Sequence, residues 1–169
     1  MKKSILYILT LIILNSCAVK KELSQETEKL KINSILDKWH KDAAETNFDS
    51  YFDAIADDGI FIGTDATENW NKKEFMAFSK PFFDKGKAWD FTSLERNIYF
   101  STDGKTAWFD ELLNTQMKIC RGSGVLVRIN NEWKIKHYVL SMTIPNDNTN
   151  EVVSIKSAIE NQIIKEKNK

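Results

Sequence analysis

The sequence has little of what usually carries recognisable chemistry. It contains only two histidines, His40 and His137, and neither stands at a spacing typical of zinc ligands. It contains no glycine-rich phosphate loop, no nucleophile elbow and no basic stripe interleaved with aromatic residues. Its 24 basic and 24 acidic residues cancel, so the charge does not indicate nucleic acid or an anionic membrane surface as a partner. We therefore expect no metal site, no cofactor and no nucleic-acid partner.

An apolar run long enough to cross a bilayer is also missing. The apolar segment from Ile5 to Leu14 has about ten residues, whereas a membrane-spanning helix needs about 20. Lys2 and Lys3 precede this segment. Two positive charges before a short apolar segment predict a secretory signal peptide.

The end of this segment resembles the signal of bacterial lipoproteins. Leu14 stands three residues before Cys17, and a small residue lies on either side of the cysteine. The resemblance implies that residues 1–16 are a signal peptide that is removed, that Cys17 carries the lipid, and that residues 17–28 tether the domain to the membrane. Because Ala18 is not the aspartate associated with inner-membrane retention, we expect the outer membrane of the cell envelope, facing the periplasm. An ordinary cleaved signal with an incidental cysteine and an uncleaved anchor are the alternatives.

The sequence has two cysteines, Cys17 and Cys120. If Cys17 carries lipid, Cys120 has no partner within the chain, and no disulfide framework is expected. Cys120 is either a nucleophile or redox site, or a small apolar filler of the core. No feature that would lower the pKa of its thiol is visible in the sequence, which favours the filler.

The spacing of apolar residues changes from helical to strand-like along the chain. The first half predicts helices, the third of which begins with a capping box of Asn71 and Glu74 and ends at Gly86. After Lys87 the alternation predicts long strands, and a terminal helix follows with Asn148 as a candidate N-cap. The expected helices cover 25–45, 48–55, 72–85 and part of 147–169, and the expected strands cover 59–63, 88–100, 105–118, 119–129 and 132–144.

Helices followed by a meander of strands predict an α+β domain. Three segments of this domain are the most informative, namely Phe61–Trp70, Ala107–Glu111 and Trp133–Ser141. They resemble the SnoaL-like branch of the nuclear transport factor 2-like superfamily. The resemblance implies a cone-like curved antiparallel sheet wrapped by N-terminal helices over residues 29–146. It also implies a pocket between sheet and helices and, commonly, a homodimer formed through the sheet. The helical spacing of Val152, Ile155, Ile159 and Ile163 predicts an extra C-terminal amphipathic helix over 147–169.

Strand parity predicts which charged side chains enter such a pocket. Alternation with apolar neighbours places Arg96, His137 and, by extension along its strand, Arg121 on buried faces. On another strand we assign the buried face to Glu111 rather than to the rival face of Trp108. Because an isolated buried charge is costly, these four residues form either an internal salt-bridge network or a functional site.

The loop after the first strand adds Asp65, Glu68 and Trp70 to the candidates. A carboxylate at the rim of an apolar pocket could abstract a proton next to a carbonyl. The alternative is that the acidic residues cap turns and Trp70 fills the core. Trp39 and Trp108 are further candidates for lining a cavity, and the alternative for both is again the core.

Three functions therefore remain open. The first is a membrane-anchored module that binds a small apolar or amphipathic molecule, with Arg96 or Arg121 meeting an acidic group. The second is a lyase or isomerase acting on a small carbonyl compound, with Asp65 or Glu111 as base and His137 as acid–base partner. The third is a structural dimer without a ligand. The candidate ligand-binding residues are Trp39, Glu68, Trp70, Arg96, Trp108 and Arg121.

Overall fold

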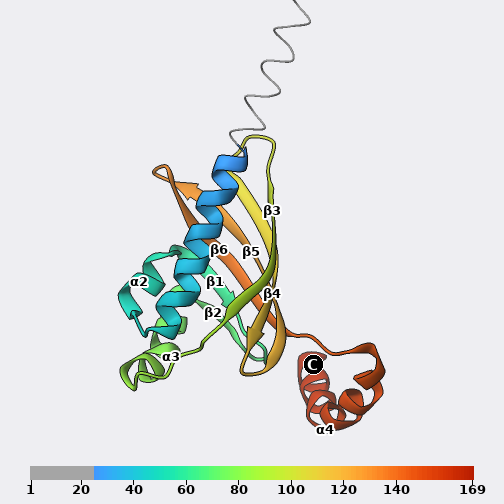
Figure 1. The fold of residues 1–169 in the computed structure, drawn as a ribbon. Helices are drawn as coiled ribbons and strands as arrows, with labels where there is room; N and C mark the ends of the chain where they lie inside the picture. Colours follow the sequence, from blue (N-terminus) through green and yellow to red (C-terminus); the bar gives the residue numbers. More distant parts are fainter. Residues whose placement is uncertain (1–24) are drawn as a thin grey trace, which may run out of the picture.

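The computed structural model describes residues 25–169, so the expected signal peptide, Cys17 and most of the expected tether lie outside the described residues. A first helix over residues 25–44 runs across the sheet (Figure 1). Among the described residues, no helix is both long and apolar enough to cross a membrane. The remaining elements are α2 (Phe48–Asp53), β1 (Ile55–Ile62), β2 (Asn69–Asn71), α3 (Lys72–Asp84), β3 (Thr92–Phe100), β4 (Thr106–Thr115), β5 (Lys118–Ile129), β6 (Glu132–Met142), the short 3₁₀ helix η1 (Asn146–Asn148) and α4 (Thr149–Lys167).

The predicted α+β architecture is confirmed. The six strands form one sheet in the order β2-β1-β6-β5-β4-β3, and β3 to β6 are the predicted antiparallel meander. The sheet is mixed rather than wholly antiparallel, because β1 pairs with β6 in parallel. Residues 55–58, predicted to end a helix or to follow it, belong to β1 instead.

The first helix covers the inner face of the sheet. Its buried apolar side chains are Ile32, Leu36, Trp39 and Ala43, a stripe with the predicted helical spacing. At the start of the helix, Glu28 accepts a hydrogen bond from Trp133 Nε1 at 2.8 Å and a second one from Arg128. Residue 28, expected in the tether, is therefore part of the folded domain.

The third helix begins and ends as the sequence predicts. The Asn71 side chain accepts a hydrogen bond from the backbone N–H of Glu74, and the Glu74 side chain accepts one from the N–H of Asn71. Gly86, with φ of +65°, follows the helix. This helix buries Phe75 and Phe83 and leaves other phenylalanines at the surface.

A β-bulge changes the parity of β6. Ile135 pairs with Leu126 and His137 pairs with Val125, so Lys136 is an extra residue on β6. Beyond the bulge, Tyr138 and Leu140 face the core. The prediction that His137 faces the pocket is therefore wrong, because one inserted residue turns it to the outer face.

From Cys120 to Gly124, the inner face of β5 carries only small residues, and Leu126 follows them. Cys120, Gly122 and Gly124 are buried, while Arg121 is exposed on the outer face. A Cβ at Gly122 would lie 2.3 Å from the Tyr138 hydroxyl, so only glycine leaves room for this ring. The predicted inward position of Arg121 is wrong. It extends the alternation of Val125 and Val127 on the same strand, and these valines lie on the outer face. Cys120 is a buried free thiol that fills the core.

The C-terminal helix α4 stands apart from the sheet (Figure 1). None of its residues is buried, and Ile155 on its apolar stripe is 80% exposed. Asn148 precedes the helix as predicted, but its side chain makes no capping hydrogen bond.

Candidate functional site

A buried carboxylate forms the polar centre of the cone interior. Glu111 lies on the inner face of β4 and is 1% exposed. Its Oε2 accepts a hydrogen bond from Arg96 Nε at 2.9 Å, and Arg96 Nη2 lies 2.8 Å from the same oxygen. Its Oε1 accepts hydrogen bonds from His40 Nε2 at 2.9 Å and from the Tyr138 hydroxyl at 3.0 Å. Both oxygens are therefore satisfied by protein groups, as a buried carboxylate requires.

The first helix supplies much of this network. His40 lies one turn after Asp37, whose Oδ1 accepts a hydrogen bond from Arg96 Nη1 at 2.7 Å. One turn earlier, Asn33 Oδ1 accepts another from the same nitrogen at 3.1 Å. The polar face of the helix thus meets the charged pair of β3 and β4, and the network ties helix to sheet.

The network stabilises the ionised form of the Glu111 carboxylate. Burial raises the pKa of the Glu111 carboxyl, but the hydrogen bond and charge of His40, together with Arg96, outweigh burial and hold this pKa below its ordinary value of 4.5. Burial, and after it the charge of Glu111, raises the pKa of the Tyr138 hydroxyl well above 10.0. Glu111 is therefore ionised and Tyr138 is a neutral donor.

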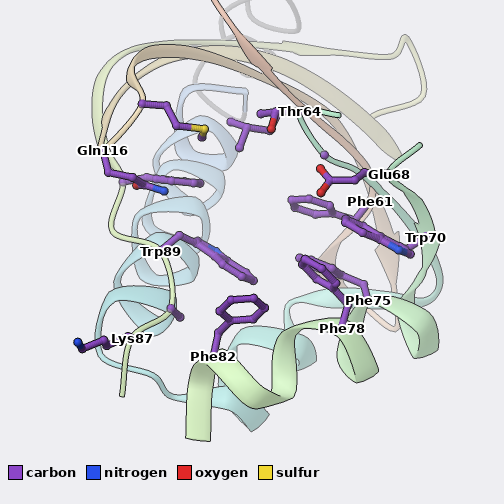
Figure 2. A pocket seen from close by; sticks show the side chains of 15 residues that line it. Phe61, Thr64, Glu68, Trp70, Phe75, Phe78, Phe82, Lys87, Trp89 and Gln116 are labelled. Carbon is purple, nitrogen blue, oxygen red and sulfur yellow. The ribbon is translucent and has the colours of Figure 1, made fainter. Parts of the chain in front are cut away.

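A cavity of about 290 Å³ lies between α3, the β1–β2 loop, the segment before β3 and the β4–β5 turn (Figure 2). Its walls are mostly aromatic, and two of these rings, Phe78 and Phe82, are 42% and 45% exposed. Several of the rings stack on one another, as Trp70 does on Phe75 with ring centroids 5.6 Å apart. The aromatic lining residues are Phe61, Trp70, Phe75, Phe78, Phe82, Trp89 and Phe91.

Few polar groups reach this cavity. The Glu68 carboxylate points into it, whereas the ammonium of the exposed Lys87 points away (Figure 2). Thr64 and Gln116 complete the polar lining. Mostly apolar walls with a few placed polar groups are typical of small-molecule sites.

The predicted loop candidates divide between the cavity and the surface. Glu68 and Trp70 line the cavity, and their roles stay predictions. Asp65 does not line it. Its carboxylate accepts hydrogen bonds from the Thr67 hydroxyl at 2.6 Å and from the Thr67 N–H at 2.8 Å. These bonds hold the Asp65 pKa below its ordinary value. Asp65 therefore caps a turn, which is the alternative that the sequence left open.

The predicted charged set is only partly brought together. Arg96 and Glu111 face inward, as predicted, and form the internal salt bridge that was one interpretation of the sequence. Neither of them lines the aromatic cavity. The predicted pairing of Glu111 with His137 is wrong, because the partner of Glu111 is the other histidine, His40.

The two tryptophans proposed as cavity residues do not line the aromatic cavity. Trp39 is buried in the core, with its ring stacked on Tyr51 and edge-on to Tyr138. Trp108 lies on the outer face of the sheet, where it is half-exposed and stacks on Tyr99. The prediction is wrong for Trp108 because Glu111 and Trp108 occupy opposite faces of β4.

Sequence reasoning missed the most important partners of both sites. His40 lies between Leu36 and Ala43 on the buried stripe of the first helix, a position that could have marked it as an interior histidine. No sequence signal identified Phe82 and Trp89 as walls of one cavity. Among the described residues, no group of three or more histidine, cysteine or acidic side chains could hold a metal ion.

Comparisons with known proteins agree with this fold. The SnoaL-like domain family matches residues 32–145. No curated protein matches the chain.

Solved structures with the same fold have low sequence identity to the chain. An NTF2-like protein from Pseudomonas putida KT2440 is 12% identical, with a TM-score of 0.62 over 73% of this chain and 92% of its own. An NTF2-like protein from Cytophaga hutchinsonii is 15% identical, with a TM-score of 0.57 over 68% and 98%. The association domain of C. elegans CaMKII is 15% identical, with a TM-score of 0.58 over 70% and 98%. The family match covers most of the chain, and the chain belongs to the SnoaL-like domain family.

Proposed function

We propose that this protein is a lipid-anchored binding module whose aromatic cavity holds a small apolar or amphipathic molecule. The observation that carries the proposal is the cavity of about 290 Å³, whose walls include the partly exposed rings of Phe78 and Phe82. Covering apolar surface is favourable by about 25 cal/mol per Å², and a ligand between these rings would cover surface that the fold leaves open.

Binding fits this geometry better than acid–base catalysis. A catalyst needs an acid and a base within reach of the same point of a cavity. Of the predicted groups, Glu111 is satisfied by its own partners, Asp65 caps a turn, and His137 lies on the outer face of the sheet. Among the lining residues that belong to the described part of the chain there is no histidine and one carboxylate, that of Glu68. A structural dimer without a ligand is also less well supported, because it would require an interior filled by side chains, whereas the cavity is open.

Native mass spectrometry of protein extracted from membranes tests this function. The wild-type protein should carry a bound small molecule. Thr64→Trp should abolish it, because this exposed residue lines the cavity and a large side chain there would occupy the space. Ala66→Trp is the matched control, since Ala66 is exposed in the same loop but does not line the cavity. Empty wild-type protein, or equal occupancy in both variants, would count against the proposal.

The lipid anchor is the second element of the proposal. It is supported by the lipoprotein-like signal that ends at Cys17, with the outer membrane favoured by Ala18. Cells grown with an alkyne analogue of palmitate should label the wild-type protein and the Cys120→Ser variant, but not Cys17→Ser. The label should fractionate with the outer membrane. Labelling that survives Cys17→Ser would refute the anchor.

A homodimer through the outer face of the sheet is the third element. Its support is a pair of partly exposed, stacked aromatic side chains on the outer face of the sheet, Tyr99 and Trp108. Light scattering on residues 25–169 should show a dimer, and Trp108→Glu should separate this dimer into monomers. Ile155→Glu, on the exposed face of α4, should leave the dimer intact. Dissociation by the second substitution alone would place the interface on α4 instead.

A further inference from the structure

We infer that the aromatic cavity selects ligands that carry a positively charged amine, and that Glu68 is the residue that recognises this charge. The inference rests on the proposed function, because it names the chemical class of the molecule in the same cavity. It comes from a comparison of two carboxylates. The fold pairs Glu111 with Arg96 and His40, whereas it pairs Glu68 with no cationic side chain among the described residues.

The carboxylate of Glu68 is held in place by its own loop. The side chain is half-buried, and its Oε2 accepts a hydrogen bond from the Asp65 N–H at 3.2 Å. The backbone carbonyl of Glu68 accepts a hydrogen bond from the Gly63 N–H at 3.0 Å. A Cβ at Gly63 would lie only 2.1 Å from Glu68 Oε2, so the absence of a side chain at residue 63 lets the carboxylate occupy its position.

The fold supplies no cation to this carboxylate. Within residues 25–169, no lysine or arginine forms an ion pair with Glu68, and its Oε1 has no hydrogen-bond partner in the same part of the chain. Lys87 is the one basic side chain among the described lining residues, and its ammonium points away from the cavity (Figure 2). By contrast, Glu111 receives Arg96 and His40. Glu68 is thus a carboxylate held in place at the cavity, with one oxygen free to accept a hydrogen bond from a ligand.

The surroundings of Glu68 suit a cation with an apolar body. The rings of Phe61 and Trp70 lie beside it, and aromatic faces attract ammonium groups by a cation–π interaction. An ammonium that donates to Glu68 would form a charge-assisted hydrogen bond, which is stronger than a neutral one. The remaining aromatic walls would hold a hydrocarbon or aromatic group. An anionic ligand of the same shape would instead be repelled by the carboxylate.

Three soluble probes of similar shape test the charge preference by titration calorimetry on the folded domain. These are 2-phenylethylamine, a cation at neutral pH, 2-phenylethanol, which is neutral, and phenylacetate, an anion. The amine should bind on the order of tenfold more tightly than the alcohol, and phenylacetate most weakly. In Glu68→Gln the preference for the amine over the alcohol should fall to within about twofold.

Asp65→Asn is the matched control, because it removes one charge from the same loop and keeps the oxygen that accepts from Thr67. It should retain the preference for the amine. Gly63→Ala gives a second perturbation, since its methyl group would displace the carboxylate without removing it, and it should weaken the amine selectively. A urea titration of each variant separates these effects from a loss of folding.

The outcomes separate this inference from the proposed function. If the alcohol or phenylacetate binds as tightly as the amine, the cavity binds small molecules but the charge selection is refuted. If the amine preference survives in Glu68→Gln, the recognition of charge by Glu68 is refuted. If none of the three probes binds, the inference fails together with the proposed binding of molecules of this size.

Discussion

Replacing Glu111 with glutamine tests whether the interior network holds the cone together. The substitution keeps the shape of the side chain and removes its charge. Arg96, whose side chain is 5% exposed, would then keep Asp37 as its one acidic partner, and Asp37 is 65% exposed. Removing one partner of a buried ion pair costs about 3–5 kcal/mol because the other charge stays buried. Since Asp37 compensates in part, we expect a loss of about 3 kcal/mol, a large share of the roughly 5–15 kcal/mol that stabilise a domain.

Urea unfolding of residues 25–169 at neutral pH, followed by circular dichroism, measures this loss in the free energy of unfolding. Glu132→Gln is the control, because it removes an exposed carboxylate from β6 and should change the free energy of unfolding by less than about 0.5 kcal/mol. A change of less than about 1 kcal/mol in Glu111→Gln would refute the view that this carboxylate is a structural centre.

The same variant has a predicted dependence on pH. The Glu111 pKa is lower in the folded protein than its ordinary value of 4.5, so ionisation of Glu111 stabilises the fold fully above that value. This contribution is lost as the pH falls below 4.5 and through the folded pKa. The difference in stability between wild type and Glu111→Gln should therefore shrink in acid. A difference that stays constant from pH 7 to pH 3 would contradict the assignment.

Three further predictions concern local structure. Gly122→Ala should cost about 1–3 kcal/mol, because the added Cβ would lie 2.3 Å from the Tyr138 hydroxyl. Asn71→Ala should cost about 1 kcal/mol through loss of the capping box. Glu28→Gln should loosen the start of the first helix by about 1 kcal/mol. Hydrogen bonds from Lys31, Trp133 and Arg128 lower the Glu28 pKa to about 2. The contribution of ionised Glu28 to stability is therefore present above pH 4.5 and lost toward pH 2.

Each of these is checked by urea unfolding against a neighbouring substitution. Ser123→Ala adds nothing to the interior, and its effect should be small beside that of Gly122→Ala. Asn69→Ala lies in the exposed β2 strand and makes no cap, so it should be milder than Asn71→Ala. Equal losses within either pair would show that the clash or the cap is not the cause. For Glu28→Gln, unchanged acid sensitivity between pH 4.5 and 2 would refute its low pKa.

Local signals in the sequence predicted the fold well. The stripe of Ile32, Leu36 and Trp39 lies within one helix, and the Asn71 capping box spans four residues, so both patterns can be recognised without knowing the rest of the structure. The inner face of β5 could not be recognised in the same way. Besides Leu126 it carries Cys120, Gly122 and Gly124. The two glycines are needed there because Glu111, Tyr138 and Phe109 from neighbouring strands fill the space above them.

The sites were harder to predict because their parts are distant in the chain. The inward position of Arg96 and Glu111 follows from strand parity, which holds where a strand is regular. Parity failed for His137 because an inserted residue in β6 turns all later side chains over. The contact of His40 with Glu111 joins residues 71 positions apart and depends on where the first helix crosses the sheet.

Nuclear Overhauser effects between the protein and bound 2-phenylethylamine show whether the aromatic cavity is the ligand site. We expect contacts from the probe to the ring protons of Trp70 and Trp89 and to the methyl group of Met117, all of which line the cavity. The same spectrum contains Tyr99 and Trp108 on the outer face of the sheet. Contacts to those two residues, with none to Trp70 or Trp89, would contradict the proposed ligand site.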